Sequence, residues 1–141
     1  MTLRSSINHR CKEDIAGFAR LTLQIVNANA SITLDHIQKG DVQTNNDPKQ
    51  REAMKDCTAL YNMIVNVHLH EALNAMDKGD YKVVKQRAYA AGVQAKTCDN
   101  KFKDSTTKPL KDTNRYVQNL CAITMSIVNK LLLPNKPTFT Y

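Results

Sequence analysis

The amino-acid sequence predicts an all-α protein, an up-down-up-down antiparallel four-helix bundle. Apolar residues recur at steps of three and four through four long segments, which is the spacing of amphipathic helices. Four glycines and four prolines in 141 residues leave few turn-forming positions, and this favours long helices over many short strands. The short connections place successive helices antiparallel, and the length suits one domain.

The first predicted helix runs from about Asp14 to Lys39. Asp14 is a suitable N-cap, and Gly40 is a suitable C-terminal stop. Its expected core stripe consists of Ile15, Phe18, Thr22, Val26, Asn29, Ile32 and His36. A polar, turn-rich linker follows at residues 40–48.

The second predicted helix runs from about Pro48 to Lys78. A proline directly after Asp47 suits the first turn of a helix, and Gly79 suits its end. The expected core stripe of this helix consists of Met54, Cys57, Tyr61, Ile64, His68, Ala72 and Ala75.

The third predicted helix, from Asp80 to about Phe102, has the most regular pattern. Its stripe steps alternately by three and four through Tyr81, Val84, Ala88, Ala91, Ala95, Cys98 and Phe102. The fourth helix runs from about Leu110 to Leu133, where Pro134 blocks continuation. Its stripe consists of Thr113, Val117, Leu120, Thr124, Ile127 and Leu131.

Charge and hydropathy exclude several classes of protein. The net charge is +7, but the 20 Lys and Arg residues are mixed with 13 acidic residues and do not form a basic block interleaved with aromatic residues. This pattern is typical of a solvated surface and argues against nucleic-acid binding. The sequence contains no run of 18 apolar residues, so we expect no transmembrane helix, and the polar N-terminus shows no signal peptide. We expect no membrane among the partners.

The cysteines on the second and third helices are expected to face each other. Cys57 and Cys98 lie on the two apolar stripes at similar distances from the turn near Gly79. A disulfide between them is one interpretation, and two buried reduced thiols in a cytosolic bundle are the other. A metal site is not expected, because the cysteines lack ligand spacing. Cys121 is expected to be a free or core thiol, and Cys11 has no obvious mate.

The sequence also argues against an enzyme. The segment HLHEALN, residues 68–74, lacks the second histidine of a zinc-protease helix, because Asn74 occupies that position. There is no Gly-rich phosphate loop and no nucleophile elbow, so we expect no catalytic residues, no metal and no cofactor. The carboxylates expected on exposed faces, explained by electrostatics within one helix, are Asp56, Glu71 and Asp80.

The helical hairpin carries a resemblance to a known family. The residues concerned are Asp56, Cys57, Tyr61, Lys78-Gly79-Asp80-Tyr81, Ala90-Ala91, Thr97-Cys98-Asp99 and Phe102. This pattern resembles the plant invertase/pectin methylesterase inhibitor domain, and the match covers roughly Asp14 to Leu133. The resemblance implies a four-helix bundle with a Cys57–Cys98 bridge. It also implies a non-enzymatic role, the one-to-one capping of a cell-wall or vacuolar carbohydrate-active enzyme.

The resemblance implies pectin methylesterase as the first target and acid invertase as the alternative. Pectin methylesterase inhibitors of the family lay bundle helices over the pectin cleft, whereas invertase inhibitors use a Pro-Lys-Phe turn between the second and third bundle helices. That turn corresponds here to Tyr81-Lys82-Val83, which retains only the lysine. The expected target-binding residues are Tyr61, Tyr81, Lys82, Val83, Thr97 and Asp99.

The N-terminus departs from the family pattern. The small helical hairpin expected there is reduced to a truncated extension at residues 1–13 with Cys11, followed by the bundle at 14–133 and a flexible tail at 134–141. Asn29 begins an Asn-Ala-Ser glycosylation sequon. The sequon and the implied bridge favour secretion to the apoplast, where the basic charge would favour weak association with anionic pectin.

Two other functions remain open from the sequence. One is a bundle that carries a small ligand, although the small side chains of Ala88, Ala91 and Ala95 leave little room for a cavity. The other is a divergent, non-inhibitory bundle that folds but has lost its target.

Overall fold

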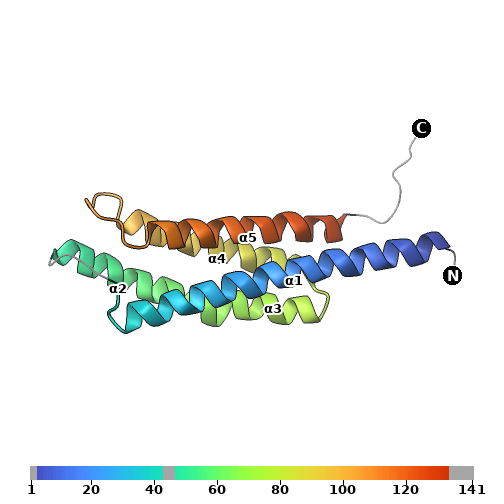
Figure 1. Ribbon diagram of the computed structural model, residues 1–141, viewed down its shortest axis with the longest axis horizontal. Helices are drawn as coiled ribbons and strands as arrows, with labels where there is room; N and C mark the ends of the chain where they lie inside the picture. Colours follow the sequence, from blue (N-terminus) through green and yellow to red (C-terminus); the bar gives the residue numbers. More distant parts are fainter. Residues whose placement is uncertain (1–2, 43–46, 134–141) are drawn as a thin grey trace.

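The computed structural model describes residues 3–42 and 47–133. In chain order the elements are α1 (Leu3–Gln38), α2 (Pro48–Met63), the π-helical turn η1 (Ile64–Leu69), α3 (His70–Asp77), α4 (Tyr81–Lys101) and α5 (Lys111–Leu132). The segments α2, η1 and α3 follow one another without a break and form a single arm of the bundle (Figure 1). The predicted all-α four-helix bundle is therefore confirmed.

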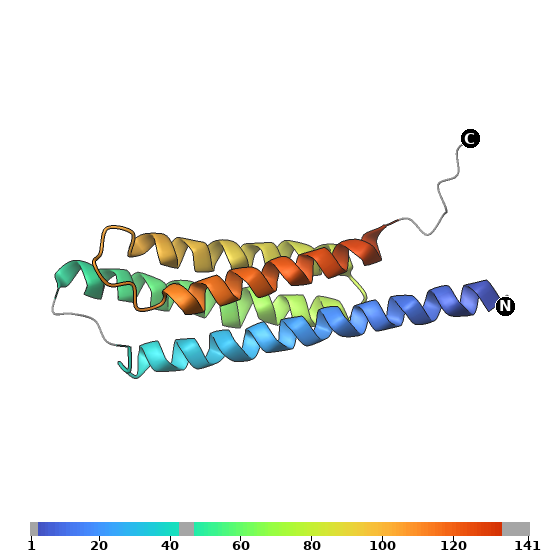
Figure 2. The same cartoon turned by 45° about the horizontal axis from the view of Figure 1, so that its top comes forward.

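The neighbours of each helix define two diagonals of the bundle. Helix α1 packs against α5 and the α2–α3 arm, and α4 packs against the same two partners. Within the described ranges α1 and α4 do not pack against each other, so they occupy opposite corners. The N-terminal part of α1 also extends beyond the ends of α3 and α5 (Figure 2).

Two expectations for α1 are wrong. The helix begins at Leu3, so Asp14 lies inside it and is not its N-cap. Phe18 and Ile32, expected in the core, are 62% and 58% exposed, and His36 is exposed as well. The physical reason is that α1 carries apolar residues on two faces, and its neighbours cover one of them. The buried face consists of Ala19, Leu23, Val26, Ala30, Thr33, Leu34 and Ile37.

The other helices follow the sequence more closely. Asp47 caps α2 by accepting a hydrogen bond from the Lys49 backbone N–H at 3.0 Å, with proline at the first helical position. The predicted stripe of α4 is buried from Val84 to Phe102. The residue boundary predicted at 13 falls inside α1, and the tail predicted at 134–141 lies outside the described residues.

The disulfide expected between the second and third helices is present. Cys57 and Cys98 are joined, with their Cα atoms 5.0 Å apart and a sequence separation of 41. Asn114 of α5 donates from Nδ2 to the Cys98 sulfur at 3.2 Å, and Tyr61 Oη donates to Asn114 Oδ1 at 2.7 Å. This buried network links α2, α4 and α5 across the core, because all four side chains are at most 1% exposed.

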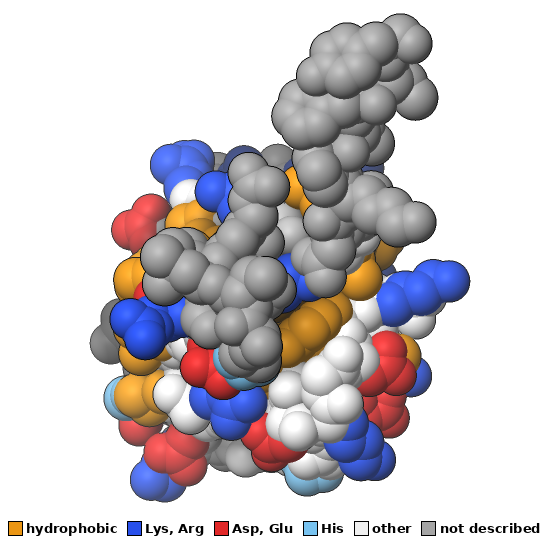
Figure 3. Space-filling view, turned by 90° about the vertical axis from the view of Figure 1, so that its right-hand side faces the viewer, with side chains coloured by type: hydrophobic (Ala, Val, Ile, Leu, Met, Phe, Trp, Pro, Cys, Tyr) orange, Lys and Arg blue, Asp and Glu red, His pale blue; other side chains and the backbone are white. Residues whose placement is uncertain are grey.

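The surface carries charged and apolar side chains side by side. Basic and acidic side chains are interspersed around the end from which α1 projects, with apolar groups between them (Figure 3). In the part of the chain that the structure describes, no helix combines the length and the hydropathy needed to cross a membrane.

We predict a specific result for thiol titration. Unfolded without reductant, the protein should show two thiols, those of Cys11 and Cys121. In the native state Cys11 should react first, because burial raises the pKa of the Cys121 thiol to about 12. Reduction of the Cys57–Cys98 bridge should lower the free energy of unfolding by about 4 kcal/mol. Four thiols without reductant would contradict the bridge.

A second prediction concerns the buried tyrosine. Tyr61→Phe removes the donor and leaves Asn114 Oδ1 unpaired in the core, so urea denaturation should show a loss of about 1–3 kcal/mol. Tyr89→Phe is the control, because Tyr89 is 61% exposed and its change should stay within about 0.5 kcal/mol. Equal effects of the two substitutions would show that the buried hydrogen bond contributes nothing.

Candidate functional site

The residues predicted to bind a target lie at two ends of α4. Tyr81, Lys82 and Val83 form its first turn, and Thr97 and Asp99 lie near its C-terminus. At 1.5 Å per residue, about 22 Å of helix separates Lys82 from Thr97. The structure therefore does not bring them into one cluster.

The first turn of α4 presents its lysine to solvent. Gly79 adopts a φ of 70°, and Asp80 caps the helix by accepting from the Val83 backbone N–H at 3.4 Å. Tyr81 and Val83 are half-buried and pack against the core, whereas Lys82 is exposed. Of this turn, Lys82 offers the most accessible side chain to a partner.

Tyr61 cannot contact a partner surface, so its predicted role in target binding is wrong. Its side chain is fully buried and hydrogen-bonded to Asn114. Burial, together with the nearby Cys121 and Asp99, raises the pKa of the phenol far above its usual range. The family resemblance suggested a contact role for Tyr61, whereas the apolar spacing had placed it on the core stripe of the second predicted helix, and the structure confirms the core position.

Thr97 and Asp99 lie at the C-terminal end of α4 and are both half-buried. The Thr97 hydroxyl donates to the Val93 backbone carbonyl at 2.8 Å, which is a bond within its own helix. Contact of these two residues with a target stays a prediction.

A groove between α4 and α5 runs along α4 from Lys82 to Lys96 and does not include Thr97 or Asp99. One hollow of about 520 Å³ is lined by Lys82, Lys85, Gln86, Tyr89, Met125 and Leu132. A second hollow of about 250 Å³ shares Tyr89 and Met125 and adds Val93 and Lys96 among its lining residues. We call these two hollows together the α4–α5 groove. Gly92 faces α5, since a Cβ added there would make ordinary van der Waals contact with the Cys121 Cβ at 3.5 Å.

The α4–α5 groove combines an apolar floor with a basic rim. Tyr89 and Val93 are 61% and 40% exposed, which is high for apolar side chains on a helix that also contributes to the core. Lys82, Lys85 and Lys96 line the groove, and among the described residues no acidic side chain does. An aromatic and aliphatic floor with cations at its edge is suited to an acidic protein surface. Tyr89 and Val93 were not predicted as site residues from the sequence, although both lie opposite the alanine stripe of the same helix.

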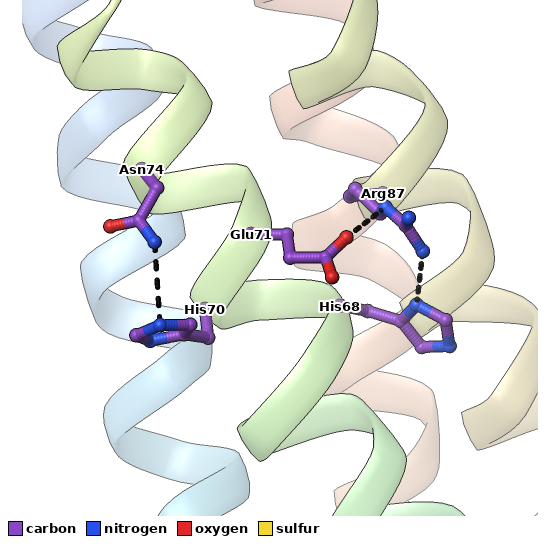
Figure 4. A network of polar contacts seen from close by, with 5 residues as sticks. All are labelled: His68, His70, Glu71, Asn74 and Arg87. Atoms are coloured by element: carbon purple, nitrogen blue, oxygen red, sulfur yellow. Dashed lines mark hydrogen bonds and ion pairs between the residues drawn. The ribbon is translucent and has the colours of Figure 1, made fainter.

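A separate polar network lies between α3 and α4. Arg87 Nε pairs with Glu71 Oε2 at 2.6 Å, and Arg87 Nη1 lies 3.4 Å from His68 Nδ1 (Figure 4). Glu71 therefore pairs across helices, as Asp56 does with Lys101, and not within one helix as expected. The network fixes α4 against the arm on the side away from the groove.

The two histidines of HLHEALN point in different directions (Figure 4). His68 is 7% exposed and faces α4, whereas His70 lies 3.3 Å from the Asn74 amide on the outside of α3. The described residues contain no group of three or more His, Cys, Asp or Glu side chains that could hold a metal ion. The π-helical turn η1 carries His68 toward Arg87.

The sequon lies in the middle of α1. Asn29 is half-buried, and its Oδ1 atom is enclosed without a hydrogen-bond partner among the described residues. Glycosylation of Asn29 stays a prediction.

Comparison with known proteins gives consistent matches. The sequence profile of the family described as plant invertase/pectin methylesterase inhibitor matches residues 2–127. A curated Arabidopsis thaliana protein named cell wall / vacuolar inhibitor of fructosidase 1 is 28% identical over 114 residues, 81% of this chain and 53% of the relative. The chain thus spans about half the length of that relative.

Solved structures match as well. The crystal structure of a pectin methylesterase inhibitor from Arabidopsis thaliana aligns with a TM-score of 0.74 and 27% identity, over 86% of this chain and 80% of that chain. The structure of a mutant form A of a pectin methylesterase inhibitor from Arabidopsis aligns over the same shares, with a TM-score of 0.76 and 26% identity.

A third prediction concerns pH. Burial, with a smaller effect of Arg87, lowers the pKa of His68 below its usual range, while Glu71 opposes this. The unfolded chain therefore binds this proton more readily. Above the ordinary histidine pKa near 6.5, His68 is neutral in both states and costs the folded state no stability. As the pH falls below that value, the unfolded chain takes up the proton first, and the free energy of unfolding decreases by no more than about 1.4 kcal/mol per pH unit.

Chemical denaturation of His68→Gln between pH 7.5 and pH 5 should accordingly show a shallower loss of stability than the original protein. His70→Gln is the matched control, because His70 is exposed and should keep the original slope. Identical slopes for all three proteins would exclude His68 as the titrating group.

Proposed function

Because the chain belongs to the plant invertase/pectin methylesterase inhibitor family, we propose that it binds and blocks a plant cell-wall pectin methylesterase in a one-to-one complex. In this role the chain is an inhibitor and not an enzyme, and it uses no cofactor. Its partner is a protein, not a nucleic acid or a membrane. The site of action is the cell wall or apoplast, in keeping with the words "cell wall / vacuolar" in the relative's name.

The α4–α5 groove is the observation that carries this proposal. Its helices are held by the Cys57–Cys98 bridge and the buried Asn114 bond, so the surface loses little conformational entropy on binding. Lys82, Lys85 and Lys96 would complement carboxylates on the surface of the target enzyme. Exposed Tyr89 supplies an aromatic anchor of the kind found at interface centres.

Acid invertase is the second candidate target. The relative named as an inhibitor of fructosidase supports it, and the invertase part of the family name does so too. Against it, the turn Tyr81-Lys82-Val83 lacks the flanking residues of the Pro-Lys-Phe turn, and Val83 packs against the core instead of projecting. Because Lys82 of that turn is retained, inhibition of invertase is measured as well.

A direct inhibition assay tests the proposal. Purified protein should inhibit a plant pectin methylesterase at mildly acidic pH, and a parallel assay with acid invertase ranks the two targets. Inhibition of neither enzyme would overturn the proposed function. The basic surface should add only weak association with de-esterified pectin, which salt should reverse.

The groove itself is tested by the double substitution Tyr89→Ala/Lys96→Glu. Removing the anchor and reversing one rim charge should weaken inhibition by at least about tenfold, or 1.4 kcal/mol. Lys130→Glu is the matched control, because Lys130 is an exposed lysine of α5 outside the groove. Equal inhibition constants for the two variants would exclude the α4–α5 groove as the contact surface.

A further inference from the structure

The outer face of α1 carries an apolar stripe that the bundle leaves uncovered. Phe18, Leu21, Ile25 and Ile32 are 62%, 50%, 39% and 58% exposed. A helix that is apolar on both faces is typically covered on both. The opposite face of the same helix is fully buried at Ala19, Leu23, Val26 and Ala30.

The apolar surface continues onto α5. The hydroxyls of Thr22 and Thr124 lie 2.7 Å apart and fix the register between the two helices. Tyr116 and Ile123 are 43% and 47% exposed and lie two turns apart on α5. Gln118, Ala122 and Met125 face α4, so helical geometry places Tyr116 and Ile123 on the other side, toward α1. A contiguous exposed apolar surface of this kind marks an interaction site.

The outer stripe of α1 has the periodicity of a coiled-coil seam. Steps of four and three alternate without interruption through Asp14, Phe18, Leu21, Ile25, Ala28, Ile32, Asp35 and Lys39. All eight side chains are exposed. The backbone N–H of Lys39 still bonds to the Asp35 carbonyl at 3.0 Å, so the helical phase holds to the end of the stripe. A repeat of 3.5 residues is the pattern by which one helix packs along another.

We propose that this α1 face binds the same face of a second copy of the chain, with the two α1 helices antiparallel. In the self-complementary register Leu21 lies opposite the partner's Ile32, and Asp14 lies opposite the partner's Lys39. The two-fold axis repeats each pair. Such an isologous contact closes as a dimer.

The centre of this pairing is apolar. Ile25 lies opposite the partner's Ala28, whose single methyl group leaves room for the larger side chain. Because the pair is repeated by the two-fold axis, a large residue meets a small one on both sides of the centre. This alternation allows the two helices to approach closely along the seam.

Charge complementarity selects this arrangement. A parallel pairing in register would place Asp14 against Asp14 and Lys39 against Lys39, which is repulsive at both ends. The antiparallel pairing instead places Asp14 opposite Lys39 at both ends. Phe18 then lies opposite the partner's Asp35, and the apolar pairs in the middle are formed by Leu21, Ile25, Ala28 and Ile32. Lys39 also pairs with Asp35 of its own helix at 3.0 Å, so its ammonium would lie between two carboxylates in the dimer.

The dimer is independent of the enzyme target. Since α1 lies diagonally across the bundle from α4, pairing through α1 leaves the α4–α5 groove accessible on both copies. A dimer that inhibits no enzyme would refute the proposed function alone, and a monomer that inhibits would refute this inference alone.

Sedimentation equilibrium of the full chain tests the pairing. Between about 1 and 200 μM, the protein should change from monomer toward dimer, as expected for a modest interface. Leu21→Glu/Ile32→Glu buries like charges at the seam and should weaken the dimer by at least about a hundredfold. Tyr89→Glu/Val93→Glu is the matched control on α4 and should leave dimerisation unchanged. A monomer across the whole concentration range would overturn the proposal, even if the α1 face binds a different protein. Equal effects of the two double variants on dimerisation would overturn it as well.

A charge exchange tests the register. Asp14→Lys should weaken the dimer by about tenfold, because two attractive pairs become repulsive. Lys39→Asp should do the same, and the double variant Asp14→Lys/Lys39→Asp should return to within about threefold of the original dissociation constant. Circular dichroism and thermal unfolding should confirm that each variant folds. A double variant as weak as the single variants combined would overturn the antiparallel register.

Discussion

The disulfide between Cys57 and Cys98 is the constraint on which the bundle depends. It joins the α2–α3 arm to α4 in the core, where no water competes for the polar groups around it. Asn114 uses its amide to bind the bridge sulfur and its carbonyl to accept from Tyr61, so α5 is held in register by the same few atoms. With three corners of the bundle fixed in this way, α1 packs into the remaining corner against α5 and the arm. The α4–α5 groove is stable for the same reason, because α4 and α5, which form its two walls, both contribute side chains to this buried network.

The sequence predicted α4 well and α1 poorly for one physical reason. On α4 the two faces differ chemically, since alanines occupy the buried face and lysines and other polar groups lie on the outer one. On α1 both faces are apolar, so a stripe through Phe18 and Ile32 fits the same periodicity as the true stripe through Leu23 and Val26. Apolar periodicity predicts that a helix is present. It cannot show which of two apolar faces is buried, because that depends on where the neighbouring helices pack. The N-terminal start of α1 was missed because Asp14 is a good capping residue at a position where the chain is already helical.

The candidate site shows the same division between local and tertiary information. Lys82 was identified through the resemblance, because it corresponds to the lysine of the family's Pro-Lys-Phe turn, and the structure leaves it exposed. The groove was not, because Tyr89 becomes part of it only when α5 lies alongside. The sequence does contain a signal for the π-helical turn. The core stripe of the second predicted helix advances by four residues twice in succession, from Ile64 to His68 and from His68 to Ala72. Two such steps exceed two turns of an α-helix, and a wider turn keeps these residues on the core face.

The two diagonal corners of the bundle have opposite surface chemistry. The outer face of α4 is basic and carries isolated apolar anchors, a composition that binds a partner from solution and tolerates water when unbound. The outer face of α1 is apolar along its centre with charges of opposite sign at Asp14 and Lys39, a composition that is costly to leave in water and that complements itself when reversed. Because these corners do not pack against each other, occupation of one does not require any change in the other. The diagonal arrangement therefore permits one chain to pair with its own kind through α1 while α4 stays available to a different protein.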